Sequence, residues 1–412
     1  MQRNKSVRLF QRFWLTYSNY LRNSLFEGAA SCSFGFVFSF IPIIMIVLSI
    51  ISGTLAKYPA VLNYLLELSE DFSSVYDLRP LIINFSQKQS FSIFDIVLWI
   101  WVIWVARKFF LSIARNISSI FHSESPQKGY VIQLMTFIGE FALILGLIAI
   151  VITSFLLNRF FTLPAFTNLG ERFPLLFGNF LSRMTSVIFY AFLFIFSFLV
   201  YRFESRTAPH AHLCLWNSIL FTFSFWVISF FINKFTNFSN YTLIYGAISS
   251  VIILMMKVYL FFILFLFFAQ NVYVSQNLES LIFCEMYMLP SKHSKKFADK
   301  IKRIIFIDPY FIQDEENTLI LKEGDIIYSA GESSDFVYFI KKGKVIEELE
   351  NDEEKVFEKG VFFGEKSAVL KKNRKGTTSA GCDTEIIKIP ADKFRSLLIK
   401  NPRASAFAMR KL

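Results

Sequence analysis

Six long apolar stretches, separated by polar or turn-rich segments, constrain this sequence more than any other feature. Each approaches the roughly 20 residues that an α-helix needs to cross a hydrocarbon core about 30 Å thick. They are about Gly28 to Ile51, Phe91 to Phe110, Leu134 to Leu157, Thr185 to Tyr201, Leu213 to Ile232 and Leu243 to Gln270. The composition agrees, since 54% of the 412 residues are hydrophobic and only 18% are charged. We predict an α-helical, multi-pass membrane bundle of about six transmembrane helices.

The positions of lysine and arginine predict how these helices are oriented. Basic residues resist translocation and collect in cytosolic loops. They are more frequent before the first span, after the second and after the fourth than in the opposite loops, and a Lys-rich segment from Lys292 to Arg303 follows the sixth. The formal charge of +11 is therefore interpreted as topology signals and lipid-headgroup contacts, not as a nucleic-acid surface. We expect both termini in the cytoplasm, with the lipid bilayer as partner and no nucleic acid.

The segment before the first span has apolar residues at helical spacing, with arginines on the other face. The apolar residues are Phe10, Trp14, Tyr17 and Leu21, and the arginines are Arg8 and Arg12. Such a pattern is typical of a helix lying in the membrane interface. A continuation of the first transmembrane helix is an equal alternative.

Apart from Arg107 and Lys108 at the end of the second stretch, the charged residues inside the apolar stretches, where charge is costly, are Asp95, Glu140 and Lys257. At about 1.5 Å per residue, Glu140 and the long side chain of Lys257 reach a similar depth, so we hypothesise a buried pair between them. The pair has two interpretations. It is a structural contact inside the bundle, or it is part of a path for a polar solute or ion.

From about Leu319 the pattern changes to short β-type runs separated by glycines. The expected strands are DIIYSA, DFVYFIKKG, KVIEELE, KVFEKG and EIIKIP, with turns at Gly324, Gly331, Gly343 and Gly360 and a helix from Ala391 to Lys400. We predict a membrane domain over residues 1–277, a cytosolic linker over 278–316 and a soluble β domain over 317–412.

The segment FFGEKSAVLKKNRKGTTSA, from Phe362 to Ala380, carries the most specific chemistry. It resembles the phosphate-binding cassette of cyclic-nucleotide-binding domains, in which Phe-Gly-Glu is followed by a short helix and Arg-x-Ala-Ser/Thr. The matching residues are Phe363, Gly364, Glu365, Arg374 and Thr377. The resemblance implies a jelly-roll β-barrel with flanking helices over about Leu319 to Leu398.

The resemblance also implies how a cyclic nucleotide would be held. A planar guanidinium suits a singly charged cyclic phosphate, which makes Arg374 its candidate partner, and Glu365 stands where the family accepts a ribose hydroxyl. Backbone N–H groups after Gly364, including that of Ser367, would point at the phosphate. The candidate ligand-binding residues are Gly364, Glu365, Ser367, Arg374, Lys375 and Thr377. The candidate ligands are cAMP, cGMP or a cyclic dinucleotide; no metal and no other cofactor are expected.

This sequence departs from the family pattern at several positions of the cassette. Lys366 and Ser367 replace apolar residues, Lys375 follows the arginine, and Gly376 replaces alanine. Base preference is therefore left open. The alternative is a degenerate barrel that keeps Glu365 and Arg374 as a surface ion pair and binds no nucleotide.

The membrane part resembles the YihY/BrkB family of bacterial inner-membrane proteins, over about Arg8 to Asn277. The resemblance rests on EGAASCSFGFVFSFIPIIMIV and on VYRF followed by NYTLIYGAISSVIILMMKVYLFFILFLFFAQN. Where many relatives end the last helix with an acidic residue, this chain has Gln270. The resemblance implies a cell inner membrane location.

Three functions follow as hypotheses. The first is a transporter or permease-like protein regulated by the nucleotide sensor, and the second is a membrane-anchored sensor or scaffold without transport. The third is a membrane-associated ribonuclease, a label that this family has carried. The four histidines are scattered and no GxSxG, P-loop or HExxH motif occurs, so we predict that the chain is not an enzyme. Nucleotide domains of this type often work in oligomers, which makes a homo-oligomer an expectation.

Overall fold

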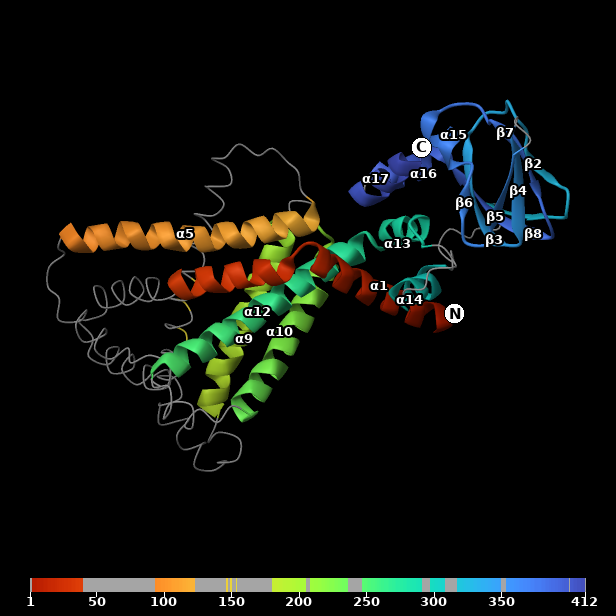
Figure 1. The fold of residues 1–412 in the computed structure, drawn as a ribbon. Coiled ribbons are helices and arrows are strands. Elements are labelled where there is room, and N and C mark those ends of the chain that lie inside the picture. Colours follow the sequence, from red (N-terminus) through yellow and green to blue (C-terminus); the bar gives the residue numbers. More distant parts are fainter. Residues whose placement is uncertain are drawn as a thin grey trace. The chain divides into compact units, whose positions relative to one another are not determined.

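The computed structural model describes residues 2–39, 93–122, 180–204, 208–235, 247–290, 297–307, 317–349, 353–399 and 401–411, with the single residues Gly146, Ala149 and Thr153. The chain forms two compact units (Figure 1). One is Thr16–Gln276, and the other combines Met1–Leu15 with Asn277–Leu412.

The first unit is built of long apolar helices. Its elements are the last part of α1 (Gln2–Arg22), the helix Leu25–Ser39, α5 (Ile93–Phe121), α9 (Phe180–Leu199), the π-helical turn η1 (Val200–Glu204), α10 (Ala211–Phe235) and α12 (Ala247–Gln276). Within the described residues, three segments are long and apolar enough to cross a membrane: Ser186–Phe203, Ala211–Ile232 and Leu254–Gln276. They match the fourth, fifth and sixth expected spans. The third expected span lies almost wholly outside the described residues, so the count of six stays a prediction.

Two helices run further toward the C-terminus than their apolar stretches predicted. We expected the second span to end at Phe110, whereas α5 continues to Phe121, because Ile117 and Ile120 are fully buried and extend the packed face. The sixth was expected to end at Gln270, whereas α12 continues to Gln276, and Val272 is likewise fully buried. The buried, packed face of each helix thus extends beyond the expected end of its span.

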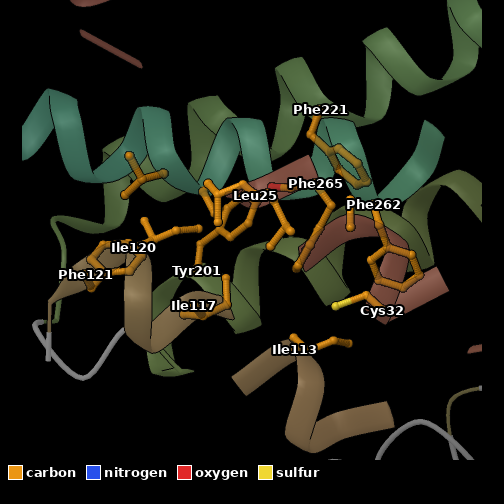
Figure 2. Packing of buried hydrophobic residues seen from close by; sticks show 14 of the residues in the cluster. Leu25, Cys32, Ile113, Ile117, Ile120, Phe121, Tyr201, Phe221, Phe262 and Phe265 are labelled. Carbon is orange, nitrogen blue, oxygen red and sulfur yellow. The ribbon is translucent and has the colours of Figure 1, made fainter. Parts of the chain in front are cut away.

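Aromatic rings fill the core of the helical unit (Figure 2). Phe262 and Phe265 of α12 are its centre: the ring centroid of Phe262 lies 5.8 Å from that of Phe109, and the centroid of Phe265 lies 5.7 Å from that of Phe221. The Tyr201 hydroxyl of η1 donates to the Phe265 carbonyl at 2.8 Å. The two ring pairs are edge-to-face contacts, which contribute to stability beyond the apolar area that they bury. The Phe-rich composition therefore forms a specific core.

Small residues let the helix Leu25–Ser39 approach α5 closely. A Cβ at Gly28 would lie 2.0 Å from Asn116 Oδ1, and one at Gly35 would lie 3.3 Å from the Phe109 Cα. Small residues serve this purpose in membrane helix packing.

The N-terminal helix α1 is an element of its own. It ends at Arg22 and is separated from the next helix by a turn in which Ser24 has φ of 50°, so it is not a continuation of the first span. Phe10, Tyr17 and Leu21 are each about half exposed, as an interface helix requires. Its place in a membrane interface stays a prediction.

The first fifteen residues group with the C-terminal unit, although we assigned them to the membrane domain. The buried Gln11 side chain donates to the Ile305 carbonyl at 2.8 Å, and Arg8 pairs with Glu279 at 3.2 Å. These polar contacts join segments nearly 300 positions apart, which no local pattern reveals.

The C-terminal unit contains two four-stranded antiparallel sheets, in the orders β1-β8-β3-β6 and β2-β7-β4-β5. The strands are β1 (Thr318–Leu321), β2 (Ile326–Tyr328), β3 (Phe336–Lys342), β4 (Lys344–Leu349), β5 (Glu354–Glu358), β6 (Phe362–Phe363), β7 (Gly376–Ala380) and β8 (Thr384–Pro390). The predicted strands correspond to β2, β3, β4, β5 and β8, and the four predicted turn glycines have positive φ. Strands β1, β6 and β7 were not predicted; β6 is two residues long, and β7 reads GTTSA, without an apolar face.

The helices described in this unit are α13 (Leu278–Tyr287), α14 (Phe297–Phe306), α15 (Glu365–Leu370), α16 (Ala391–Ile399) and α17 (Pro402–Lys411). The helix expected from Ala391 is α16. Helices α13 and α14 fall in the segment expected to be a linker, but α13 packs as part of the domain. Its Phe283 ring lies 5.6 Å from Phe394 of α16, and its Tyr287 ring lies 5.7 Å from Phe362 of β6.

Candidate ligand site in the C-terminal barrel

The turn between β6 and α15 places Gly364 against the side chain of Arg374. Gly364 is the residue before α15, with φ of 71°, a conformation that side chains with a Cβ rarely adopt. A Cβ at this position would also lie 2.6 Å from Arg374 Nη1. Glycine is therefore required here twice, by the backbone and by the approaching guanidinium.

The guanidinium of Arg374 is buried and held from two sides. The side chain is only 4% exposed. Nη1 donates to the Gly364 carbonyl at 2.6 Å, Nη2 donates to the Phe336 carbonyl, and the guanidinium carbon lies 4.2 Å from the centre of the Tyr328 ring. Within the described residues the Nε–H has no acceptor. A buried cation whose Nε–H is unused suits an incoming anionic oxygen.

Glu365, the first residue of α15, is also buried. Burial raises the pKa of its carboxyl, and the nearby Lys411 of α17, whose Nζ lies 3.8 Å from Glu365 Oε1, lowers it in part. The predicted alternative of a surface ion pair between Glu365 and Arg374 is not what the structure contains. Both side chains are buried, and the described contacts of Arg374 are with carbonyls and aromatic rings.

The remaining cassette candidates lie around this pair. The Ser367 carbonyl accepts from the Ser334 hydroxyl at 3.0 Å, and Thr377 Oγ1 accepts from the Ala330 N–H at 3.3 Å. Lys375, next to the buried arginine, is exposed. Of the cassette candidates, Gly364 and Arg374 are thus in direct contact.

Sequence reasoning missed Tyr328, which lies beside Arg374, and Glu347, which lies beside Tyr328. Tyr328 stacks on the guanidinium, and its hydroxyl donates to Glu347 of β4 at 3.3 Å. Burial raises the pKa of the Tyr328 hydroxyl well above its usual value. The period of two along β4, with Val345 fully buried, was the available signal that Glu347 shares the inward face.

The intramembrane candidates are described only in part. Lys257 lies in α12 and is half-buried, Asp95 lies in α5 with its side chain outside the described residues, and Glu140 is wholly outside them. The Glu140–Lys257 pair therefore stays a prediction. Within the described residues, no group of three or more His, Cys, Asp and Glu side chains is arranged to hold a metal ion.

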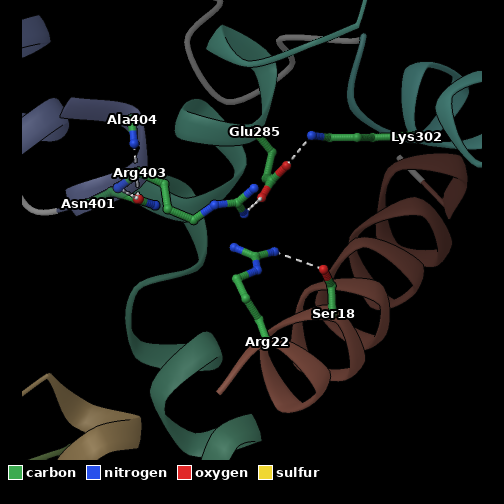
Figure 3. Close-up of polar contacts among 7 residues, drawn as sticks. All are labelled: Ser18, Arg22, Glu285, Lys302, Asn401, Arg403 and Ala404. Carbon is green, nitrogen blue, oxygen red and sulfur yellow. Dashed lines mark hydrogen bonds and ion pairs between the residues drawn. The ribbon is translucent and has the colours of Figure 1, made fainter. Parts of the chain in front are cut away.

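A second polar cluster, also missed, joins three helices that flank the barrel (Figure 3). Glu285 of α13 is 5% exposed and pairs with Lys302 of α14 at 2.5 Å and with Arg403 of α17 at 3.8 Å. Asn401 caps α17 by accepting from the backbone N–H of Arg403 at 3.1 Å and of Ala404 at 3.3 Å. One buried carboxylate thus ties α13, α14 and α17 together.

Comparisons with known proteins find a matching family for each half of the chain. The family model described as virulence factor BrkB matches residues 16–280, and the model of the cyclic nucleotide-binding domain matches residues 318–401. The apolar helices and the barrel with its cassette define a membrane protein that carries a C-terminal domain of the cyclic-nucleotide-binding type. Because the first match covers more than half of its length, the chain belongs to the BrkB family.

Individual relatives match a smaller part of the chain. The lysophospholipase NTE1 of Phaeosphaeria nodorum is 31% identical over 109 residues, which are 24% of this chain and 7% of that protein. An EAL enzyme solved with cAMP and cyclic-di-GMP bound is 23% identical, covering 23% of this chain and 26% of its own, with a TM-score of 0.21. The Thermus thermophilus catabolite activator protein is 21% identical, covering 23% and 46%, with a TM-score of 0.21. The chain thus spans less than half of each of these relatives.

Proposed function

We propose that this protein is a transporter or permease-like protein of the bacterial inner membrane, regulated by a cyclic nucleotide that binds the C-terminal barrel. The observation that carries the proposal is the buried guanidinium of Arg374, which keeps an unused N–H donor next to the turn at Gly364. Burying a cation costs free energy unless anions or dipoles compensate it. A cyclic phosphate supplies that compensation.

The ligand class follows from the two anchors. Arg374 offers a positive charge to the phosphate, and Glu365 offers a carboxylate to a ribose hydroxyl. The distribution of lysine and arginine favours a cytoplasmic position for both termini, and therefore for the barrel. Cyclic nucleotides are made in that compartment.

Regulation requires that ligand binding changes a helix connected to the membrane part. Helix α12 ends at Gln276 and α13 begins at Leu278, so Asn277 alone separates them. The same α13 holds Glu285, whose ion pair with Arg403 reaches α17, and α17 carries Lys411 beside Glu365. A ligand that binds Glu365 competes with Lys411 and so favours one arrangement of these helices, which is the differential affinity that coupling needs.

The binding test uses the full chain in lipid nanodiscs, titrated with cAMP, cGMP and cyclic-di-GMP by calorimetry. Arg374→Lys keeps the positive charge but loses the planar set of guanidinium donors. Glu365→Gln keeps the shape of the side chain but loses its negative charge. Losing a charge-assisted hydrogen bond costs about 1.5–3 kcal/mol, so each variant should weaken binding roughly ten- to hundredfold. Lys372→Ala, at an exposed position of the same loop, is the matched control.

Regulation is tested on the same samples by hydrogen exchange in Leu254–Gln276 with and without nucleotide, and transport by ion flux into liposomes. A ligand-dependent change in exchange and in flux is expected. Binding without any flux would leave the membrane-anchored sensor, and absence of binding by the folded chain would refute the proposal.

A further inference from the structure

Glu347 places a carboxylate on the inward face of the barrel. It stands two residues after the fully buried Val345 on β4, and its carboxylate accepts from the buried Tyr328 hydroxyl at 3.3 Å. The next residue, Glu348, is exposed, as the alternation of a strand requires. An inward carboxylate in a small barrel needs hydrogen-bond donors.

The ring of Tyr328 lies between this carboxylate and the Arg374 guanidinium, the first anchor of the proposed ligand. Tyr328, which donates to Glu347, stacks on the Arg374 guanidinium. The negative charge of Glu347 also contributes to the raised pKa of Glu365, so the two carboxylates are within electrostatic range of each other. If Arg374 binds the phosphate and Glu365 binds the ribose, the Glu347 carboxylate remains as the group that can bind the base.

The two purines present different hydrogen-bonding edges to such a group. Guanine carries two adjacent donors, N1–H and the N2 amino group, and a carboxylate accepts from both at once. Adenine carries one donor, the N6 amino group, beside the N1 lone pair, so one carboxylate oxygen would face another acceptor. A site built to accept two hydrogen bonds discriminates against a ligand that leaves one unmade.

We propose that Glu347 reads the base of the cyclic nucleotide and makes the barrel prefer guanine to adenine. The inference rests on the proposed function, because it assumes that the barrel binds a cyclic nucleotide at Arg374 and Glu365. Two further residues stand directly opposite Glu347 in the strand register, Lys355 of β5 and Thr378 of β7. Lys355 is exposed.

The test compares dissociation constants for cGMP, cAMP and cyclic IMP on the full chain in nanodiscs. A bidentate contact to a base is worth about 1–3 kcal/mol, so cGMP should bind roughly 5- to 150-fold tighter than cAMP. Cyclic IMP keeps N1–H but lacks the N2 amino group, and should fall between them. Cyclic-di-GMP presents the same guanine edge, so its affinity relative to cGMP identifies which guanine nucleotide is the ligand.

Two variants complete the test. Glu347→Gln offers one donor and one acceptor, which match adenine, so the preference for cGMP should vanish or reverse while cAMP still binds. Glu348→Gln, the same substitution on the exposed face, should leave the ratio unchanged. Equal or tighter binding of cAMP by the unmodified chain, or cyclic IMP binding as well as cGMP, would overturn the role of Glu347 without touching the proposed function. Binding of no cyclic nucleotide at all would overturn both.

Discussion

Replacing Glu285 by glutamine should loosen the helices around the barrel without unfolding its sheets. The carboxylate is 5% exposed and pairs with Lys302 at 2.5 Å and Arg403 at 3.8 Å. Removing one partner of a fully buried ion pair costs about 3–5 kcal/mol, because the other charge remains buried. Here the Lys302 side chain is 20% exposed and that of Arg403 is 52% exposed, so water recovers part of the loss. We expect Glu285→Gln to lower the free energy of opening of these helices by about 1–3 kcal/mol.

The assay is hydrogen exchange followed by peptide mass spectrometry on the full chain. Exchange in α14 and α17 should accelerate about 5- to 150-fold, since each 1.4 kcal/mol is a factor of ten in the opening equilibrium. Exchange in β3 and β8 should not change. Glu279→Gln is the control, because Glu279 lies on the same helix and its ion pair with Arg8 is exposed, at 70% and 44% for the two side chains. Equal, small effects of both substitutions would refute the view that buried charge joins the three helices.

Two further predictions concern the cassette. In thermal unfolding, Gly364→Ala should destabilise the barrel by about 1–3 kcal/mol more than Gly331→Ala. Both glycines have positive φ, but a Cβ at Gly364 would meet Arg374, whereas nothing lies within 4 Å of a Cβ at Gly331. The second prediction concerns pH. Burial raises the pKa of the Glu365 carboxyl above its usual 4.5, so the folded state favours the protonated form. This contribution to the free energy of unfolding is complete below pH 4.5 and is lost as the pH rises through the folded pKa. Glu365→Gln should flatten that decline in the unfolding midpoint, and Glu354→Gln, at an exposed carboxyl, should not; an unchanged slope in Glu365→Gln would contradict the assignment.

The sequence alone determined the class of each half of the chain, because the determining patterns are local. Runs of about 20 apolar residues predict helices in lipid, and the described spans Ser186–Phe203, Ala211–Ile232 and Leu254–Gln276 follow them. Strands β3 and β8 were predicted because their apolar β-type residues are consecutive. The cassette from Phe362 to Ala380 was found because its residue types and spacing are specific.

Only the tertiary structure decided which groups meet. The partners of Arg374 are two carbonyls and the ring of Tyr328, Glu365 lies beside Lys411, and Glu285 joins three helices. Most of these contacts join residues far apart in the chain, and their energies depend on burial, which a sequence pattern does not report. Strand β7 is the clearest case: GTTSA has no apolar alternation, and it is a strand because β2 and β4 supply its hydrogen-bonding partners on both sides.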